Sequence, residues 1–473
     1  MALRPSFSTF AGARGAIALA AAALGFVVTG FMPQVLNDGD TFLHVAAGRR
    51  MLTEHAILFR DPFSYTFAGA PWDAHEWLAE IAMALCHAAG GWRGVLILFA
   101  LAAACAAGAL SYALGRWLEP KAQALATVLA LSCMTASLLA RPHLLALPLL
   151  VLWTAALAKA RDEQRAPPLA LAALMALWVN IHGSFLLGLA LAGGLALEAL
   201  VARRRWDVLR DWSLFGLCAV GAALLNPHGW NGLAFPFALM DTAALGHVGE
   251  WQATPLSLFQ PVVPIAIFTA YIVLSRRVAM SPIRAAMLLA LAYLAFAHAR
   301  HQMVLAAVAP LLLAQPLSAA LGRARADTID WRAAGAVATV LLVLLAGLRL
   351  AMPLTRGDAA AAPMTALAHV QPSLRAQPVL NDYSFGGYLI FAGVKPFIDS
   401  RVELYGEAAL ERYAALIKPD RAMLDDQIRR HAIAWAILPP ASPIVAELDA
   451  SPGWHRLFAD HYAVVQFRDK TAR

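Results

Sequence analysis

With 473 residues, of which 60% are hydrophobic and only 14% charged, this chain is too apolar for an ordinary soluble protein. Its net charge of +7 does not point to nucleic acid, because the Lys and Arg residues are spread over short loops and lack interleaved aromatic residues. The composition therefore predicts a polytopic α-helical membrane protein.

Windows of about 20 apolar residues predict about eleven membrane spans. The first window is long enough to cross a bilayer and has no clear small-residue cleavage site after it, so we expect an uncleaved signal anchor. Two of the windows are short enough to be half-helices, namely 167–180 and 212–226. The eleven windows are 16–36, 92–117, 121–139, 143–160, 167–180, 183–202, 212–226, 260–276, 283–299, 302–321 and 333–352.

The positions of Lys and Arg predict which ends of the spans face the cytoplasm. If the N-terminus is cytoplasmic, 17 of these residues fall in cytoplasmic segments and six in the opposite loops up to the last span. Such an excess is typical of cytoplasmic loops. An odd number of spans then places the chain after residue 353 on the extracytoplasmic side.

The first extracytoplasmic loop, residues 37–91, holds the sharpest chemical signal. Asp38 and Asp40 directly follow the first span, and His44 lies one helical turn after Asp40, so a carboxylate and an imidazole can face one reacting centre. Two acids at this spacing can divide metal binding and proton abstraction between them. The alternative is that an acid here only caps a helix beginning near Thr41.

Two surface helices are expected outside the membrane core. Asp73 and Glu76 have the spacing of a capping box, which would open an amphipathic helix reaching about residue 88. We expect this helix to lie along the membrane surface with Trp72 and Trp77 at the level of the headgroups. A second interfacial helix is expected at 229–241, where aromatic and small residues alternate.

Polar residues also interrupt the apolar runs at the extracytoplasmic ends of several spans, where ionisable groups are costly and often functional. Arg141 with His143, and Arg300 with His301, suit a phosphate because a guanidinium presents a planar fork of donors. Arg141 can equally be an interfacial residue that reaches to the headgroups. The remaining candidates to line a cavity are Asn180, His182, Asn226, His228, Glu250, His75 and Glu76.

Each of these candidates also has a simpler interpretation. A lone histidine at such a position is more often a satisfied structural group than a ligand. Glu250 lies in a loop without Lys or Arg and can be an ordinary solvated residue.

The composition changes after residue 353. Short β-branched and aromatic runs, PVLND, YLIF, KPFID, AIAWAIL and HYAVVQF, are separated by helical stretches at about 407–430. This pattern predicts a small α/β domain over 354–473, which follows a transmembrane module over 1–353. Within it we expect Asp399 and Arg401 to pair with each other.

The first loop contains the patterns D-T-x-x-H-x-x-x-G, from Asp40 to Gly48, and D-P-F-S-x-T-x-x-G-x-x-W-x-x-H-E-W-L, from Asp61 to Leu78. In these it resembles a group of bacterial membrane proteins, and the whole arrangement resembles the GT-C glycosyltransferases. That class includes protein O-mannosyltransferases and the aminoarabinose transferase of lipid A. By this resemblance Asp40 matches the catalytic acid of the first loop. Many members have Asp-Glu here, whereas Thr41 follows Asp40 in this chain, so Asp38 or Glu250 is a candidate second carboxylate.

The resemblance implies inverting transfer of a sugar from a polyprenyl-phosphate donor to an extracytoplasmic glycan, lipid or protein. It implies a bacterial inner-membrane protein with a cytoplasmic N-terminus and a periplasmic C-terminal domain. Asp40, Asp38 and His44 would be catalytic, and the donor phosphate would be bound by Arg141, His143, Arg300 and His301. A divalent cation, Mg²⁺ or Mn²⁺, fits the acids at Asp38 without being required. The alternatives are a flippase of a lipid-linked glycan, disfavoured by the lack of an internal repeat, and a non-catalytic assembly subunit.

Overall fold

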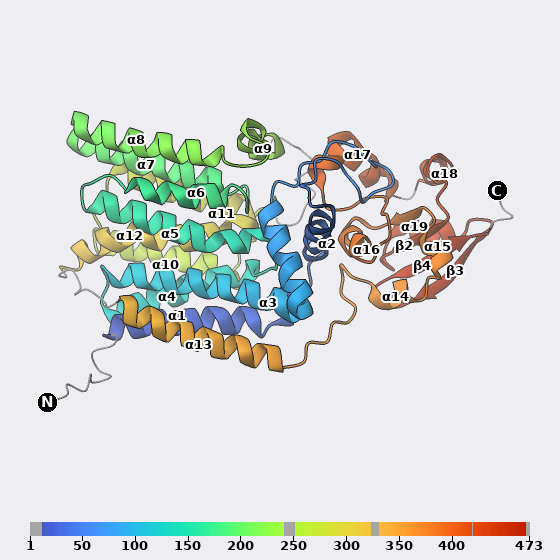
Figure 1. The fold of residues 1–473 in the computed structure, drawn as a ribbon, viewed down its shortest axis with the longest axis horizontal. Helices are drawn as coiled ribbons and strands as arrows, with labels where there is room; N and C mark the ends of the chain where they lie inside the picture. The colour runs from blue at the N-terminus through green and yellow to red at the C-terminus, as the bar shows by residue number, and fades with distance from the viewer. Residues whose placement is uncertain (1–11, 241–250, 323–330, 419, 470–473) are drawn as a thin grey trace.

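The computed structural model describes residues 12–240, 251–322, 331–418 and 420–469. A bundle of helices forms one end of the molecule, and a smaller region with a β-sheet forms the other (Figure 1). Each of the eleven apolar windows contains a helix of this bundle. These helices are α1 (Ala13–Gly30), α3 (Trp77–Gly115), α4 (Pro120–Met134), α5 (Pro142–Asp162), α6 (Ala172–Trp178), α7 (Phe185–Arg203), α8 (Trp206–Ala223), α10 (Val262–Ser275), α11 (Pro282–Ala297), α12 (Gln302–Ala320) and α13 (Trp331–Ala351).

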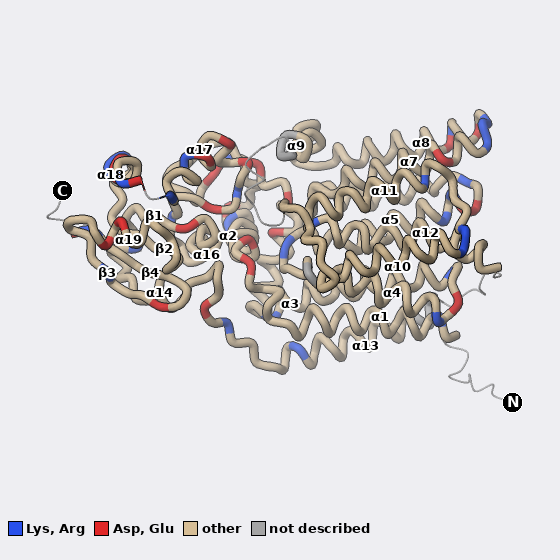
Figure 2. Tube along the Cα trace, turned by 180° about the vertical axis from the view of Figure 1, so that it is seen from behind, with Lys and Arg blue, Asp and Glu red and all other residues tan. Residues whose placement is uncertain are grey.

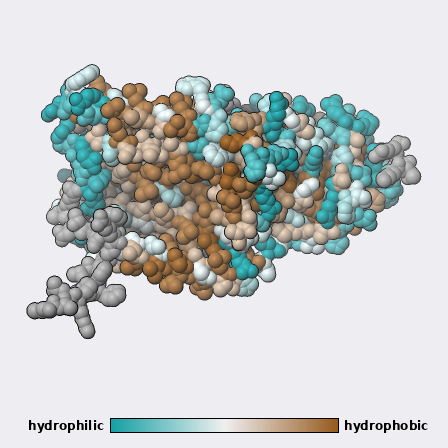
Figure 3. Space-filling model, in the orientation of Figure 1, coloured by the Kyte–Doolittle hydropathy of each residue, from teal (hydrophilic) through white to brown (hydrophobic). Residues whose placement is uncertain are grey.

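The helices have the composition of membrane spans. Within the described ranges, five helical segments are long and apolar enough to cross a membrane: α1, α3, α5, α7 and the segment Ala299–Ala320. Four further apolar helices are shorter. On the face seen in Figure 3, the surface of the bundle is apolar between two hydrophilic ends. The prediction of a helical membrane protein is confirmed, and the number of eleven spans stays a prediction.

Local sequence explains where several helices begin and how closely they pack. Proline opens α4, α5 and α11, because its fixed φ suits the first helical position and its missing N–H costs nothing there. Small residues let α1 approach α3: a Cβ added to Gly25 would lie 2.8 Å from the Ala103 carbonyl oxygen. Close approach of backbones at small residues is typical of helix pairs in membranes.

The first loop contains helix α2 (Gly39–Glu54) and the first part of α3. Helix α3 bends at Gly90 and Gly91, and the Gly91 backbone (φ 58°, ψ −148°) is a conformation open in practice only to glycine. The bend separates a surface helix, 77–89, from the span that follows. The predicted second interfacial helix is also present, as α9 (Trp230–Met240).

Two details predicted for this loop are wrong, and the depth of Trp77 in the membrane stays a prediction. The capping box does not form, because α3 begins only at Trp77 and the Asp73 carboxylate lies 3.3 Å from His228 Nδ1. Trp72 is buried and donates its Nε1–H to Glu403 at 2.8 Å, and Trp77 donates to the Asn180 side chain at 2.8 Å. Protein carboxylate and amide groups, rather than lipid headgroups, satisfy both indoles.

The C-terminal region has a four-stranded sheet in the order β1-β2-β4-β3. Strands β1 and β2 are parallel, with Leu380 opposite Ala436, and the other pairs are antiparallel. Alternate strand residues enter two hydrophobic clusters, so both faces of the sheet are covered. The strands are β1 (Val379–Asn381), β2 (Trp435–Leu438), β3 (Trp454–Ala459) and β4 (Val464–Arg468), and the helices are α14 (Met364–Ala368), α15 (Pro372–Arg375), α16 (Gly386–Phe391), α17 (Val402–Leu416), α18 (Arg421–Arg430) and α19 (Pro443–Asp449).

The strands predicted from PVLND, AIAWAIL and HYAVVQF are confirmed as β1, β2 and β4. The run YLIF instead lies in helix α16, and KPFID forms no strand. Strand β3 escaped prediction because most of its residues are exposed and its burial does not alternate. The boundary predicted after residue 353 falls in the connection between α13 and α14 and stays a prediction.

The first loop and the C-terminal region are joined by a shared core and by buried charges. Trp72 of the loop packs in one hydrophobic cluster with Leu404 and Tyr405 of the C-terminal region. Arg401 lies 2.7 Å from both Asp399 and Asp61, so it ties the loop to the C-terminal region. The predicted pairing of Asp399 with Arg401 is confirmed. This junction, rather than the bundle alone, shapes the cavities described next.

Candidate active site

A cavity of about 1090 Å³ lies where the bundle meets the first loop and the C-terminal region. One part of its wall is apolar and comes largely from the spans; it includes Leu139, Leu147, Leu150, Leu186, Leu187 and Val304. The other part is polar. It includes nine of the residues selected from the sequence, namely Asp40, His44, His75, Glu76, Arg141, His143, His182, Arg300 and His301.

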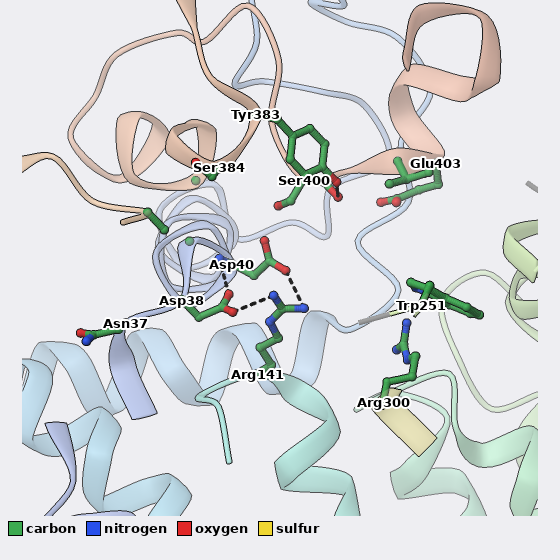
Figure 4. A pocket seen from close by; sticks show the side chains of 14 residues that line it. Asn37, Asp38, Asp40, Arg141, Trp251, Arg300, Tyr383, Ser384, Ser400 and Glu403 are labelled. Atoms are coloured by element: carbon green, nitrogen blue, oxygen red, sulfur yellow. Dashed lines mark hydrogen bonds and ion pairs between the residues drawn. The ribbon is translucent and has the colours of Figure 1, made fainter. Parts of the chain in front are cut away.

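A smaller cavity of about 300 Å³ adjoins the large one (Figure 4). It lies between the start of α2 and the C-terminal region and includes Asp38 in its lining. The two cavities share part of their lining, namely Asp40, Arg141, Trp251, Arg300, Ser400 and Glu403. A group bound in one cavity would therefore lie next to a group bound in the other.

Arg141 bridges the two acids of the first loop. Its guanidinium lies 2.7 Å from Asp38 and 3.1 Å from Asp40 (Figure 4). Asp38 also caps α2, since its side chain accepts from the Asp40 backbone N–H at 2.8 Å. Arg141 has an extended backbone because Pro142 follows it, which directs the chain into α5 while leaving Arg141 at the helix end. The capping and functional interpretations of the acids are thus compatible.

The environment of Asp40 suits a proton acceptor. Burial raises the pKa of this carboxyl above its usual range, and the charge of Asp38 adds to that effect, while Arg141 and His44 oppose it. A carboxylate with a raised pKa is a better base than one in water. Asp40 therefore has both the position and the basicity for general-base work.

Three imidazoles surround the Glu76 carboxylate. His44, His75 and His182 have ring nitrogens 3.7, 3.8 and 3.6 Å from it, and His44 Nδ1 is 3.0 Å from Glu80. Burial raises the pKa of Glu76 to about 8 although His44 opposes this, and burial lowers the pKa of His75 to about 3. Burial also disfavours charge on His44, but Glu80 and Glu76 outweigh it and raise its pKa to about 9. At neutral pH His44 is the charged imidazole of this group.

The second arginine, Arg300, also lines both cavities. Arg300 and His301 belong to the short helix η7 (Ala299–His301) between α11 and α12. The Arg300 guanidinium stacks over the Trp251 ring at 4.4 Å. His143 Nε2 lies 3.1 Å from the Ser137 carbonyl oxygen, which fixes that ring in the wall.

Three predicted cavity residues do not line either cavity. Asn180 bonds to Trp77 and to the Leu225 carbonyl, and Asn226 accepts from the His228 backbone N–H. His228 pairs with Asp73. Their contacts are those of structural groups that hold loops together. Glu250 lies outside the described residues.

Several lining residues were not selected from the sequence. Glu80 follows Glu76 by one helical turn and faces the same cavity, so helical spacing alone could have found it. Tyr383, Ser400 and Glu403 carry no local signal, because only the packing of the C-terminal region on the first loop brings them to Asp40.

Among the described residues no three His, Cys, Asp or Glu side chains are placed to hold a metal ion together. Both Asp38 and Asp40 already engage Arg141. The divalent cation suggested for this motif stays a prediction, and no step below depends on it.

No protein-family model and no curated protein sequence matches the chain. Solved structures do match it. ArnT from Cupriavidus metallidurans bound to undecaprenyl phosphate has a TM-score of 0.54 at 13% identity, covering 96% of this chain and 97% of ArnT. The chain has the ArnT fold. The apo state of ArnT gives a TM-score of 0.51 at 14% identity, covering 90% of this chain and 92% of ArnT.

The ArnT fold extends to a second solved protein. The mycobacterial arabinofuranosyltransferase AftD has a TM-score of 0.51 at 15% identity, covering 96% of this chain but 41% of AftD. Both ArnT and AftD are GT-C glycosyltransferases, so the resemblance predicted from the sequence is confirmed for the fold. At such identities the match establishes the ArnT fold and leaves the reaction to be argued from the site.

Proposed function

We propose that this protein transfers a sugar from a polyprenyl-phosphate donor to an acceptor on the extracytoplasmic side of the membrane, with inversion at the anomeric carbon. One observation carries the proposal. Asp40, a partly buried carboxylate with a raised pKa, and two arginines lie together where an apolar cavity wall meets a polar one. This is the junction at which a phosphate attached to an isoprenoid chain would be bound.

The donor fits the large cavity by its chemistry. The leucine-rich wall suits an isoprenoid chain, since burial of apolar surface is favourable and carries no directional requirement. Arg141 and Arg300 suit the phosphate, because guanidinium groups stay charged and pair with phosphate oxygens. The undecaprenyl phosphate bound to ArnT, a protein of the same fold, supports this class of donor.

The reaction would be a single displacement. The acceptor hydroxyl oxygen attacks the anomeric carbon and gives its proton to the Asp40 carboxylate. The bond between the anomeric carbon and the phosphate oxygen breaks, and that oxygen keeps the electron pair as polyprenyl phosphate leaves. Arg141 and Arg300 stabilise the charge that develops on the phosphate. One displacement from the face opposite the leaving group inverts the anomeric configuration.

The proposal includes a location in the bacterial inner membrane, with the N-terminus cytoplasmic and the C-terminal region periplasmic. Lys and Arg gather at the end of the bundle next to the N-terminus (Figure 2). The cavities lie at the other end, beside the C-terminal region. By the positive-inside rule this distribution supports an extracytoplasmic site.

The test is transfer of label from radiolabelled undecaprenyl-phosphate sugars, supplied as a panel, to acceptors in membranes that contain the protein. Asp40→Asn keeps the size of the side chain but cannot accept the proton, so we expect transfer to fall by about 10²–10⁴-fold. The matched control is Asp426→Asn, which removes an exposed carboxylate of helix α18 and should retain transfer.

Turnover by Asp40→Asn at the wild-type rate would contradict the proposed role of Asp40. Movement of labelled lipid across liposomes without any transfer would favour a flippase. If the label were neither transferred nor moved across the membrane, a non-catalytic assembly subunit would be the better account.

A further inference from the structure

We propose that the smaller cavity binds one sugar ring of the acceptor, and that residues of the C-terminal region select it. The inference rests on the proposed transferase function and adds to it the chemical class of the acceptor. It assigns the acceptor to glycans or glycolipids that present a terminal sugar, rather than to a protein hydroxyl.

The cavity has the size and position for such a ring. Its volume of about 300 Å³ is at the lower end of ligand pockets, which suits one sugar ring rather than a chain. Its walls come from three parts of the molecule, and the bundle contributes Arg141, Trp251 and Arg300. The start of α2 supplies Asp38 and Asp40, and the C-terminal region supplies Tyr383, Ser400 and Glu403.

The lining has the chemistry that hydroxyl groups need. Each sugar hydroxyl donates one hydrogen bond and accepts others, so carboxylates, hydroxyls and guanidinium groups side by side can satisfy it. Figure 4 shows the carboxylates of Asp40 and Glu403 facing a common space, with Ser400 between them and Trp251 beside them. An indole offers an apolar face to the C–H bonds of a sugar ring.

Glu403 is held in place for this role. Its Oε1 accepts the Trp72 indole N–H at 2.8 Å, which fixes the carboxyl group at the first turn of α17. Burial raises the pKa of Glu403, while its bond to Trp72 opposes that effect. Arg141 pairs with Asp38 and Asp40, which offsets the charge of these two acids and suits an uncharged ring.

The contact between the two cavities indicates from which side the acceptor would attack and on which side the phosphate would leave. Asp40 and Arg141 belong to both linings. An acceptor hydroxyl in the small cavity would reach Asp40 from one side, while the donor phosphate in the large cavity would lie on the other. Attack and departure on opposite sides are what an inverting displacement needs.

The test measures binding without turnover. Purified protein in nanodiscs is mixed with the methyl pyranosides of glucose, galactose, mannose, N-acetylglucosamine and N-acetylgalactosamine, and saturation-transfer NMR detects which are bound. We expect at least one to bind. Glu403→Gln keeps an oxygen for Trp72 but loses the carboxylate, so binding should weaken by about tenfold or more. Tyr383→Phe, which removes only a hydroxyl, should also weaken it.

The matched control is Glu407→Gln, an exposed residue of the same helix that does not line the cavity and should bind as wild type. Binding of undecaprenyl phosphate, measured by native mass spectrometry, should be unchanged in Tyr383→Phe and Glu407→Gln, since neither residue lines the large cavity. The inference would be overturned if the wild type bound no pyranoside. It would also be overturned if Glu403→Gln and Tyr383→Phe both bound the pyranosides as tightly as the wild type does.

A second arm separates the acceptor's sugar from the donor's own sugar. If the small cavity holds the acceptor, pyranoside binding persists when the protein is saturated with undecaprenyl phosphoglucose. Loss of binding with undecaprenyl phosphoglucose, but not with undecaprenyl phosphate, assigns the cavity to the donor and overturns the inference. Neither result depends on transfer, so a failure of the Asp40→Asn test is distinguishable from a failure here.

Discussion

At the scale of single residues, His44 sets the charge balance next to Asp40. Its Nδ1 lies 3.0 Å from Glu80, and despite burial, Glu80 and Glu76 raise its pKa from 6.5 to about 9. Glu76 differs from an exposed acid, since burial raises its pKa from 4.5 to about 8. In the folded protein at neutral pH both groups therefore hold protons that an unfolded chain would partly release.

These shifts predict how stability depends on pH. Between pH values of about 4.5 and 9, His44 and Glu76 together bind more protons in the folded protein than in the unfolded chain, so their contribution to the free energy of unfolding falls as pH rises through this window. Each of the two groups accounts for a loss on the order of 2–3 kcal/mol between pH 6 and pH 9. The melting temperature in nanodiscs measures it, and the double variant His44→Asn/Glu76→Gln should show a much smaller fall.

A melting temperature that rises from pH 6 to pH 9, or a fall of the same size in the double variant, would refute this assignment of charges.

Residues of the site differ in how far sequence predicts them. Asp40 and His44 were predictable because helical spacing places them on one face. Arg141 and Arg300 were predictable because ionisable residues at the ends of apolar spans are often functional. Tyr383 and Glu403 were not, because they lie more than three hundred residues from Asp40 in the chain. Contacts between distant segments bring them to the site, among them those of the buried Arg401 with Asp61 and Asp399 and the core around Trp72.

At the scale of elements, the bend in α3 sets the position of the surface helix relative to the span. Gly91 adopts φ 58° and ψ −148°, which residues with a Cβ avoid. The helix 77–89 carries Glu80 and follows Glu76 directly, so its direction determines where these acids face. A straight α3 would move them away from His44.

Replacement of Gly91 by alanine should therefore strain the bend and destabilise the protein by about 1–3 kcal/mol. Gly335→Ala in α13 is the control, because a Cβ there meets no atom within 4 Å and alanine favours a helix. The melting temperature should fall for the first variant and not for the second. Equal melting temperatures for Gly91→Ala and Gly335→Ala would show that alanine fits the backbone conformation at position 91 without strain.

Element type was predicted well for the spans and less well for the C-terminal region. Twenty-residue apolar windows have few alternatives to helix in a membrane, since all backbone polar groups must be satisfied internally. Short runs such as YLIF are compatible with either a strand or a helix. In this protein the run forms helix α16, and Leu389 of that helix packs into the hydrophobic cluster on one face of the sheet. Trp72 was misplaced because its partner, Glu403, comes from a distant segment.

At the scale of the whole molecule, charge and hydropathy give the orientation. Lys and Arg gather at the end of the bundle near the N-terminus, and the C-terminal region extends from the other end (Figure 2). An apolar surface lies between these ends (Figure 3). The membrane would therefore surround the bundle and leave the cavities at its outer boundary.

Reporter fusions test this orientation. Alkaline phosphatase, which is active only outside the cytoplasm, should be active when fused after Arg473 and inactive when fused after Arg165, in the connection between α5 and α6. Green fluorescent protein at the same two positions should show the opposite pattern. Activity of the phosphatase at Arg165 alone would reverse the proposed topology and place the site in the cytoplasm.

The central claim is that one pocket, formed by the spans, the first loop and the C-terminal region, receives the phosphate of a polyprenyl donor next to Asp40. A structure of the protein with undecaprenyl phosphate, determined by electron cryomicroscopy, measures this directly. We predict phosphate density within hydrogen-bond distance of Arg141 or Arg300, with the isoprenoid chain along Leu147, Leu150 and Leu186. Phosphate bound at the opposite, Lys- and Arg-rich end of the bundle, with the pocket beside Asp40 empty, would contradict the account.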